Sequence, residues 1–201
     1  MNLKSRLPPL PVVVANVVVL LACSPSAVAE TATKVAPELR ESSIRTLRAV
    51  LEREDRWVKV HAAEFLLELD YRDGVEATFL QELDRYGEEP EYRIGIWRVL
   101  AKATYDPKAK ARWISRIREV FLDPDAPDRL HAVETLAKLG VTVAAGTESP
   151  QARAERDVFE RAAAGGDAMA PFARWVLVNS DPNHDDAPLG KLLAADDARI
   201  R

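Results

Sequence analysis

The fold is decided by a stretch of thirteen residues, Asp128-Arg129-Leu130-His131-Ala132-Val133-Glu134-Thr135-Leu136-Ala137-Lys138-Leu139-Gly140. At 100° per residue, its leucines, its valine and its alanines fall on one half of a helix, and the other half carries His131, Glu134, Thr135 and Lys138. Arg129 lies in the middle of the apolar half, where an unpaired charge would cost more free energy than burial of this helix gains. The stretch therefore predicts a helix that packs against neighbouring helices, with an acidic partner close to Arg129.

The same pattern occurs at two earlier places, around Lys59 and around Arg93. Each of these cations also lies in the middle of an apolar helix half, and the steps from 59 to 93 and from 93 to 129 are 34 and 36 residues. Further amphipathic helices are expected between the copies, over residues 41–54, 75–86 and 108–122. Because brief turns join helices this short and no strand pattern is sustained, the sequence predicts an all-α fold of repeated helical hairpins.

These units resemble HEAT repeats of the short bacterial kind. In that family, an acid in the turn before the second helix of a repeat and a cation early in that helix form an electrostatic ladder between neighbouring repeats. The resemblance covers residues 38–201, and it implies an α-solenoid of about four to five hairpins whose second helices line a concave side. It gives the ladder role to three pairs, Asp55 with Lys59, Glu91 with Arg93, and Asp125 with Arg129.

The polar halves of the second helices then form a concave surface of mixed charge, with Arg98 and Lys102 as its one basic spot. Much of such a surface is simply solvated, because exposed charge pairs contribute little to stability. It is nevertheless where we expect another protein to bind. The candidate contact residues are His61, Glu64, Glu68, Arg98, Lys102, His131, Glu134, Lys138 and Trp175.

A fourth copy of the pattern is degraded. Aligning Leu177 with Leu136 puts Ala170 at the ladder position and turns Trp175 outward, whereas a register one residue different buries Trp175 beside Trp97. Two interpretations of Trp175 follow. It is either a core residue, as a tryptophan on a helix usually is, or an exposed aromatic anchor for a partner.

One constellation raises the question of catalysis, because His61 with Glu64 and His131 with Glu134 each place an imidazole and a carboxylate one turn apart. Some HEAT-like hydroxylases hold iron through such residues, but theirs are adjacent in sequence. The two pairs here are two repeats, or ~20 Å, apart, and Arg98 between them disfavours a metal ion. A solvated or helix-stabilising pair is the favoured interpretation. The sequence has no phosphate-binding loop, nucleophile elbow or Cys/His metal spacing, so no catalytic residue, metal or cofactor is expected.

The composition fits one soluble helical domain. Of 201 residues, 47% are hydrophobic and 30% are charged. The net charge of −4 and the lack of a basic block argue against nucleic-acid binding. A single cysteine rules out an internal disulfide framework.

Residues 1–22 have the character of a signal peptide, with a basic start at Lys4 and Arg6. The apolar run Val12–Ala22 is too short to span a membrane. Its end, Leu20-Leu21-Ala22-Cys23, resembles the lipobox of bacterial lipoproteins. That resemblance implies acylation of Cys23 and a membrane anchor, and Ser24 after the cysteine implies the outer membrane, facing the periplasm. The alternative is an ordinary cleaved signal peptide with an incidental cysteine. Residues 23–37 are then expected to be the modified N-terminus and a flexible tether.

The end of the chain repeats the stretch that leads into the first copy of the pattern. Leu193–Arg201 matches Leu51–Lys59 in its leucine, aspartate, apolar and cationic positions. Arg201 thus occupies a ladder position, and we expect the last repeat to be incomplete.

The sequence as a whole predicts a lipid-anchored extracytoplasmic scaffold that binds another protein and is not an enzyme. One alternative is an N-terminal accessory fragment of a larger envelope enzyme or transporter-associated protein, and a third interpretation is a metal-dependent HEAT-like hydroxylase.

Overall fold

The computed structural model describes residues 35–144 and 149–181. The chain divides into two units, Met1–Val35 and Ala36–Arg201, and every described helix lies in the second. Three of the predicted features lie outside the described residues: the signal peptide, Cys23 with the tether up to residue 34, and the incomplete last repeat within residues 182–201.

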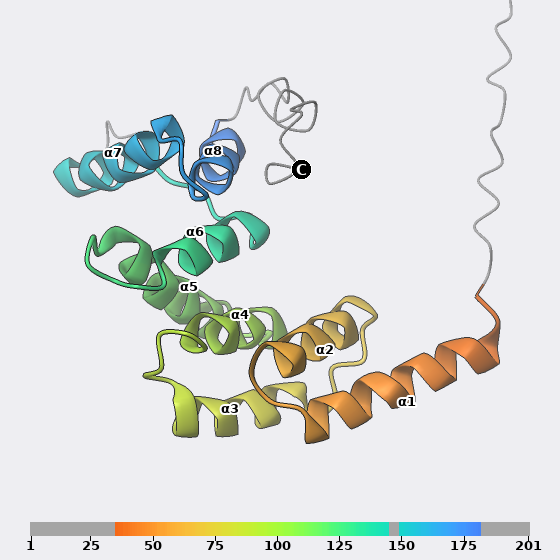
Figure 1. Cartoon of the computed structure of the whole chain (residues 1–201). Helices are drawn as coiled ribbons and strands as arrows, with labels where there is room; N and C mark the ends of the chain where they lie inside the picture. Colours follow the sequence, from red (N-terminus) through yellow and green to blue (C-terminus); the bar gives the residue numbers. More distant parts are fainter. Residues whose placement is uncertain (1–34, 145–148, 182–201) are drawn as a thin grey trace, which may run out of the picture. The chain divides into compact units, whose positions relative to one another are not determined.

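The described part of the chain is built from eight α-helices and contains no strand (Figure 1). Consecutive helices pack in pairs, which we call hairpins 1 to 4. They are α1 (Pro37–Arg53) with α2 (Arg56–Glu68), α3 (Val75–Tyr86) with α4 (Arg93–Ala103), α5 (Pro107–Leu122) with α6 (Arg129–Lys138), and α7 (Pro150–Ala164) with α8 (Ala170–Asn179). The all-α prediction is confirmed, and the three helices expected between the repeats correspond to α1, α3 and α5.

Local sequence signals account for where these helices begin and end. The side chain of Asp106 accepts hydrogen bonds from the backbone N–H groups of Lys108 and Ala109 at the start of α5. The helix itself opens with a proline, whose fixed φ suits the first helical position. Gly74 before α3 and Gly140 after α6 have φ values of 77° and 65°, a left-handed conformation that favours glycine.

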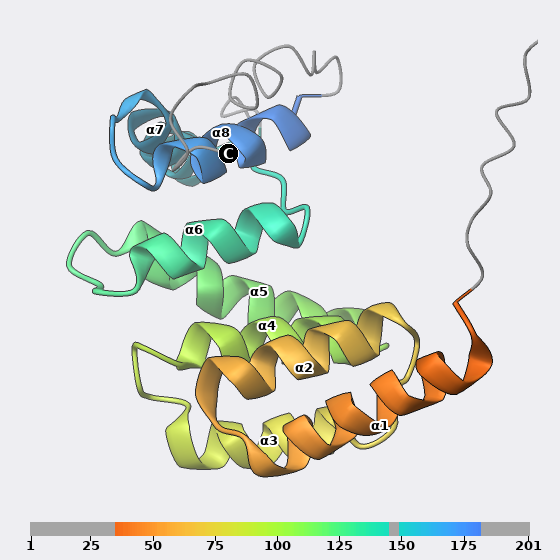
Figure 2. The ribbon, with the colours of Figure 1, turned by 45° about the vertical axis from the view of Figure 1, so that its right-hand side comes forward.

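The hairpins stack through their second helices. Figure 2 shows α2, α4, α6 and α8 following one another, and each contacts the next. The shared leucine of the repeat, which is Leu66, Leu100 or Leu136, is fully buried in the first three hairpins. This regular burial fits an α-solenoid, in which each hairpin covers the apolar face of its neighbour.

The start of the fourth hairpin's second helix agrees with the alignment of Leu177 with Leu136, although Leu177 is only half-buried and Leu136 is fully buried. Helix α8 begins at Ala170 as α6 begins at Arg129, and Ala173 is fully buried like its equivalent Ala132. Trp175 is half-buried and packs against the core. One part of the indole is therefore packed in the core, and the role of Trp175 as an anchor for a partner stays a prediction.

The outer face of hairpin 1 exposes the positions that later hairpins bury. Phe65 on α2 is 56% exposed, and Val58 and Leu69 on the same side of the helix are exposed as well. The equivalent residues of α4, which are Tyr92, Val99 and Ala103, are all buried. Hairpin 1 thus forms one apolar end of the described stack. None of the described helices combines the length and the apolar character that a membrane span requires.

Candidate partner-binding site

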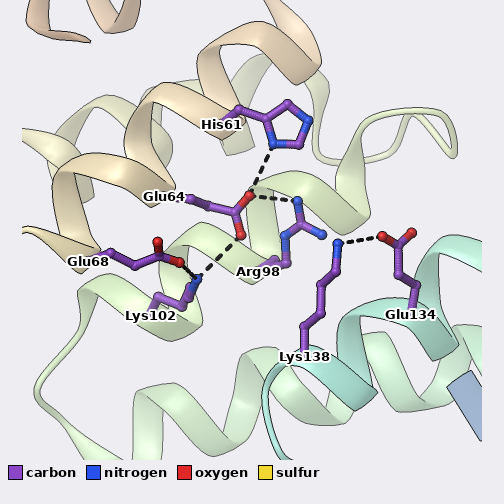
Figure 3. Close-up of polar contacts among 7 residues, drawn as sticks. All are labelled: His61, Glu64, Glu68, Arg98, Lys102, Glu134 and Lys138. Atoms are coloured by element: carbon purple, nitrogen blue, oxygen red, sulfur yellow. Dashed lines mark hydrogen bonds and ion pairs between the residues drawn. The ribbon is translucent and has the colours of Figure 1, made fainter. Parts of the chain in front are cut away.

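The predicted contact residues of α2 and α4 form one network around Glu64 (Figure 3). Arg98 donates to Glu64 Oε2 at 2.9 Å, and His61 Nδ1 lies 3.3 Å from the same oxygen. Lys102 Nζ lies 3.4 Å from Glu64 Oε1 and 3.2 Å from Glu68 Oε1. The two cations and two carboxylates therefore neutralise one another across hairpins 1 and 2.

Arg98 is not the exposed basic spot that the sequence predicts. Its side chain is only 2% exposed and lies beneath Trp57, with the guanidinium carbon 5.4 Å from the ring centroid. Lys102 keeps 27% of its side chain exposed but is bound to two acids. The helical wheel could not reveal this burial, because the wheel describes one helix and the covering side chains belong to another.

On α6 the predicted contact residues separate into two groups. Lys138 donates to Glu134 at 2.6 Å within the helix, as in Figure 3. His131 instead packs on Trp57, with ring centroids 5.2 Å apart, and His61 lies 6.2 Å from the same indole. The two imidazoles are thus much closer than the ~20 Å expected for helices two repeats apart.

Trp57 is the site residue that the sequence interpretation missed. It lies next to a groove of about 580 Å³, which we call the Trp57 groove. The groove is formed by the start of α2, the turn before α4, and the turn before α6 with its first helical turn, so three hairpins contribute to it. Its lining residues are Arg56, Trp57, Glu89, Pro90, Glu91, Pro127, Asp128 and His131.

Gly95 allows Trp57 to reach across α4. A side chain at this position would place its Cβ 2.8 Å from Val60, which is too close, and 3.3 Å from the indole, which would have to move slightly. The indole is fixed on its other side, because its Nε1 donates to the backbone oxygen of Glu91 at 2.9 Å. A signal for this arrangement does exist in the sequence: Gly95 stands where the other two copies carry His61 and His131.

The charged residues of the groove are mostly paired. Arg56 donates to Glu89 at 2.8 Å, and Arg93 binds both oxygens of Asp128 at 2.8 and 2.9 Å. Glu91 is exposed, and its carboxylate has no hydrogen bond or ion pair with any described residue. Glu91 is therefore a lining carboxylate without a direct ion pair in the described chain.

Arg56 has a strained backbone at the rim of this groove. Its φ is +53°, a left-handed value that costs a non-glycine residue on the order of 1–3 kcal/mol. The hydrogen bond and the charge of Glu89 raise the pKa of Arg56, and Glu91 adds a smaller contribution in the same direction. The negative field of both carboxylates thus reaches the cation at the rim.

The predicted ladder exists in part, but with other acids. Arg93 joins hairpin 2 to hairpin 3 through Asp128, the residue directly before α6, and not through its predicted partner Glu91. Lys59 binds Glu82 of α3 at 2.8 Å. Arg129 donates to the backbone oxygen of Phe121 at 3.0 Å.

The predicted acids Asp55, Glu91 and Asp125 are all exposed, and none is bonded to a ladder cation in the described chain. Asp128 pairs with Arg93 because it lies at the helix start and is buried against α4. Asp125 makes no such pair, since it lies in the solvent-exposed turn.

Lys59, Glu82 and Tyr92 form a buried polar cluster that ties α2, α3 and α4 together. Glu82 accepts from Lys59 through one oxygen and from the Tyr92 hydroxyl through the other, both at 2.8 Å. Burial raises the pKa of Tyr92 well above its ordinary value, and the hydrogen bond to Glu82 adds to the shift. This cluster stabilises the hairpins that hold Trp57.

Within the described ranges, no group of three or more His, Cys, Asp or Glu side chains is placed to hold a metal ion. The two His–Glu pairs instead contribute to the network around Glu64, to the Trp57 contacts and to the ion pair on α6. Trp175 belongs to α8 and is not among the residues that line the Trp57 groove. Comparison of the chain with family models, with curated proteins and with solved structures found no match.

Proposed function

We propose that this protein is a non-enzymatic scaffold that binds another protein, and that the Trp57 groove is its main contact. The observation that carries the proposal is a half-buried tryptophan in a groove to which three hairpins contribute. Tryptophan is among the residues that most often dominate binding energy at protein interfaces, particularly in a well-packed pocket. The resemblance to HEAT repeats, whose stacked hairpins present extended binding surfaces, supports the same proposal.

The arrangement of polar groups favours binding over catalysis. The lining of the groove includes no serine, threonine or cysteine that His131 could activate as a nucleophile. Its ion pairs, Arg56 with Glu89 and Arg93 with Asp128, join neighbouring hairpins across the groove. The network around Glu64 extends the surface beside it, where paired charges give a partner polar contacts at the rim.

The proposal includes a lipid anchor at Cys23 that would hold the scaffold at the bacterial cell envelope, on the periplasmic side of the outer membrane. Its support is the sequence Leu20-Leu21-Ala22-Cys23, which lies outside the described residues. Labelled fatty acid should be incorporated into the full chain and not into a Cys23→Ala variant. Equal labelling of the variant, or none of either chain, would remove the anchor from the proposal without affecting the groove.

Selection from a random peptide library tests the binding site. We expect the wild-type protein to select peptides whose affinity falls about tenfold or more in Trp57→Ala and in His131→Ala, because loss of a central aromatic contact removes well over 1 kcal/mol. Trp113→Ala is the matched control, since Trp113 is a half-buried tryptophan of α5 that does not line the groove. Circular dichroism verifies that each variant is folded. Peptides that bind all three variants equally would contradict the proposed site.

A further inference from the structure

We infer that the Trp57 groove accepts a lysine or arginine side chain of the partner. This inference rests on the proposed binding function and specifies the chemistry of the partner. It depends on three features of the groove, which are its charge, its aromatic surface and the pairing of the charges around it.

The charge of the groove favours a cation. Three carboxylates line it, those of Glu89, Glu91 and Asp128, against the single guanidinium of Arg56. Glu89 is neutralised by Arg56, and Asp128 by Arg93. The exposed Glu91 carboxylate makes no hydrogen bond or ion pair with a described residue, and the backbone oxygen of Glu91 accepts the hydrogen bond from the indole of Trp57. A basic side chain would complete the last ion pair.

The aromatic surface suits the stem of such a side chain. Because the Nε1 of Trp57 is already bonded to the Glu91 backbone, the indole offers the groove carbon surface and no free polar atom. Pro90 and Pro127 add apolar surface beside it. Lysine and arginine pack their methylene groups against such surfaces while the charged head remains near water, and an arginine head also stacks on an indole.

The cation that already lies near the indole does not oppose this arrangement. Arg98 is 5.4 Å from the ring of Trp57, but its charge is balanced by Glu64 at 2.9 Å. Arg56 provides an internal precedent, because its own guanidinium binds Glu89 within the same groove. An acidic side chain would instead meet an excess of carboxylates, and an apolar one would desolvate Glu91 without pairing it.

The peptides selected on the wild-type protein test this inference. We expect the Trp57-dependent peptides to share a lysine or arginine at one position. Replacing that residue by citrulline, the neutral counterpart of arginine, should raise Kd about tenfold, and Glu91→Gln in the protein should have a similar effect. Glu88→Gln is the matched control, because Glu88 is an exposed acid in the same turn that does not line the groove.

The outcomes separate the inference from the proposed function. The inference of a basic side chain is overturned if the Trp57-dependent peptides share no basic residue, or if they bind Glu91→Gln and Glu88→Gln equally well. The groove would then remain a binding site. A selection that returns no Trp57-dependent peptide overturns the groove, and the inference with it.

Discussion

Replacing Lys59 by methionine removes the cation from the buried cluster while keeping a side chain of similar length. Only 9% of the Lys59 side chain and 4% of the Glu82 side chain are exposed. The variant therefore leaves the Glu82 carboxylate in the core with the Tyr92 hydroxyl as its one remaining partner. Removing one member of a buried ion pair costs about 3–5 kcal/mol, because the other charge stays desolvated. That is a large share of the roughly 5–15 kcal/mol by which native proteins are stable.

Urea unfolding at neutral pH, followed by the circular dichroism of the helices, measures this loss. Lys102→Met is the matched control, because Lys102 also binds two acids but lies nearer to solvent, and its removal should cost less than about 1 kcal/mol. In Lys59→Met/Glu82→Gln the buried charge is gone and the hydrogen bond from Tyr92 can persist, so much of the lost stability should return. If Lys59→Met costs no more than the control, or if the double variant is less stable than the single one, the unpaired Glu82 charge is not the cause of the loss.

Three further predictions concern the repeat positions and pH. Gly95→Val should cost about 1–3 kcal/mol in urea unfolding, because its side chain has no room against α2, and indole fluorescence should show displacement of Trp57. Phe65→Lys should change the unfolding free energy by less than about 0.5 kcal/mol, whereas Val99→Lys at the equivalent buried position should prevent cooperative folding. Equal effects of the two substitutions would contradict the repeat register. The raised pKa of Tyr92 means that the folded state holds the phenolic proton more tightly than the unfolded state. This contribution to stability is complete at pH values below the ordinary tyrosine pKa of 10.0 and is lost as the pH rises above it. Above that pH, the unfolding free energy should therefore fall more steeply in the wild type than in Tyr92→Phe. Tyr105→Phe is the control, because Tyr105 is exposed.

The repeat could be predicted from the sequence because it depends on local periodicity. Within each copy the leucine follows the cation by seven residues, which is two helical turns, and so lies on the same helix face. These leucines, Leu66, Leu100 and Leu136, are all fully buried. The first helices were located for the same reason, since amphipathic stretches between the copies must cover the apolar faces of the second helices. For hairpin 4 the sequence left two registers open, because its copy of the pattern is degraded.

The partners of the charged residues could not be predicted in the same way. A cation in an apolar wheel indicates that an acid is near, but not which one. Lys59 binds Glu82 on the following helix, and Arg93 binds Asp128 rather than its predicted partner Glu91. These choices depend on how far each helix is shifted along its neighbour, which no single-helix wheel contains.

The Trp57 groove was missed because it exists only between hairpins. Trp57 lies outside the thirteen-residue pattern, and its position over α4 requires the missing side chain at Gly95. Arg98 illustrates the same limit, because the residues that bury it, Trp57 and Glu64, belong to α2. Comparing the repeats position by position for the absence of a side chain would have indicated where a neighbouring chain segment approaches.

The central claim is that hairpins 1, 2 and 3 together bind one segment of a partner. Photo-cross-linking tests it most directly, with a selected peptide that carries a photoreactive group beside its basic residue, followed by mass spectrometry of the labelled protein. We predict labels on lining residues from all three hairpins, among them Trp57, Pro90 and His131, and loss of these labels with excess unmodified peptide. Labels confined to one hairpin, or placed on the first helices α1 and α5, would contradict the claim.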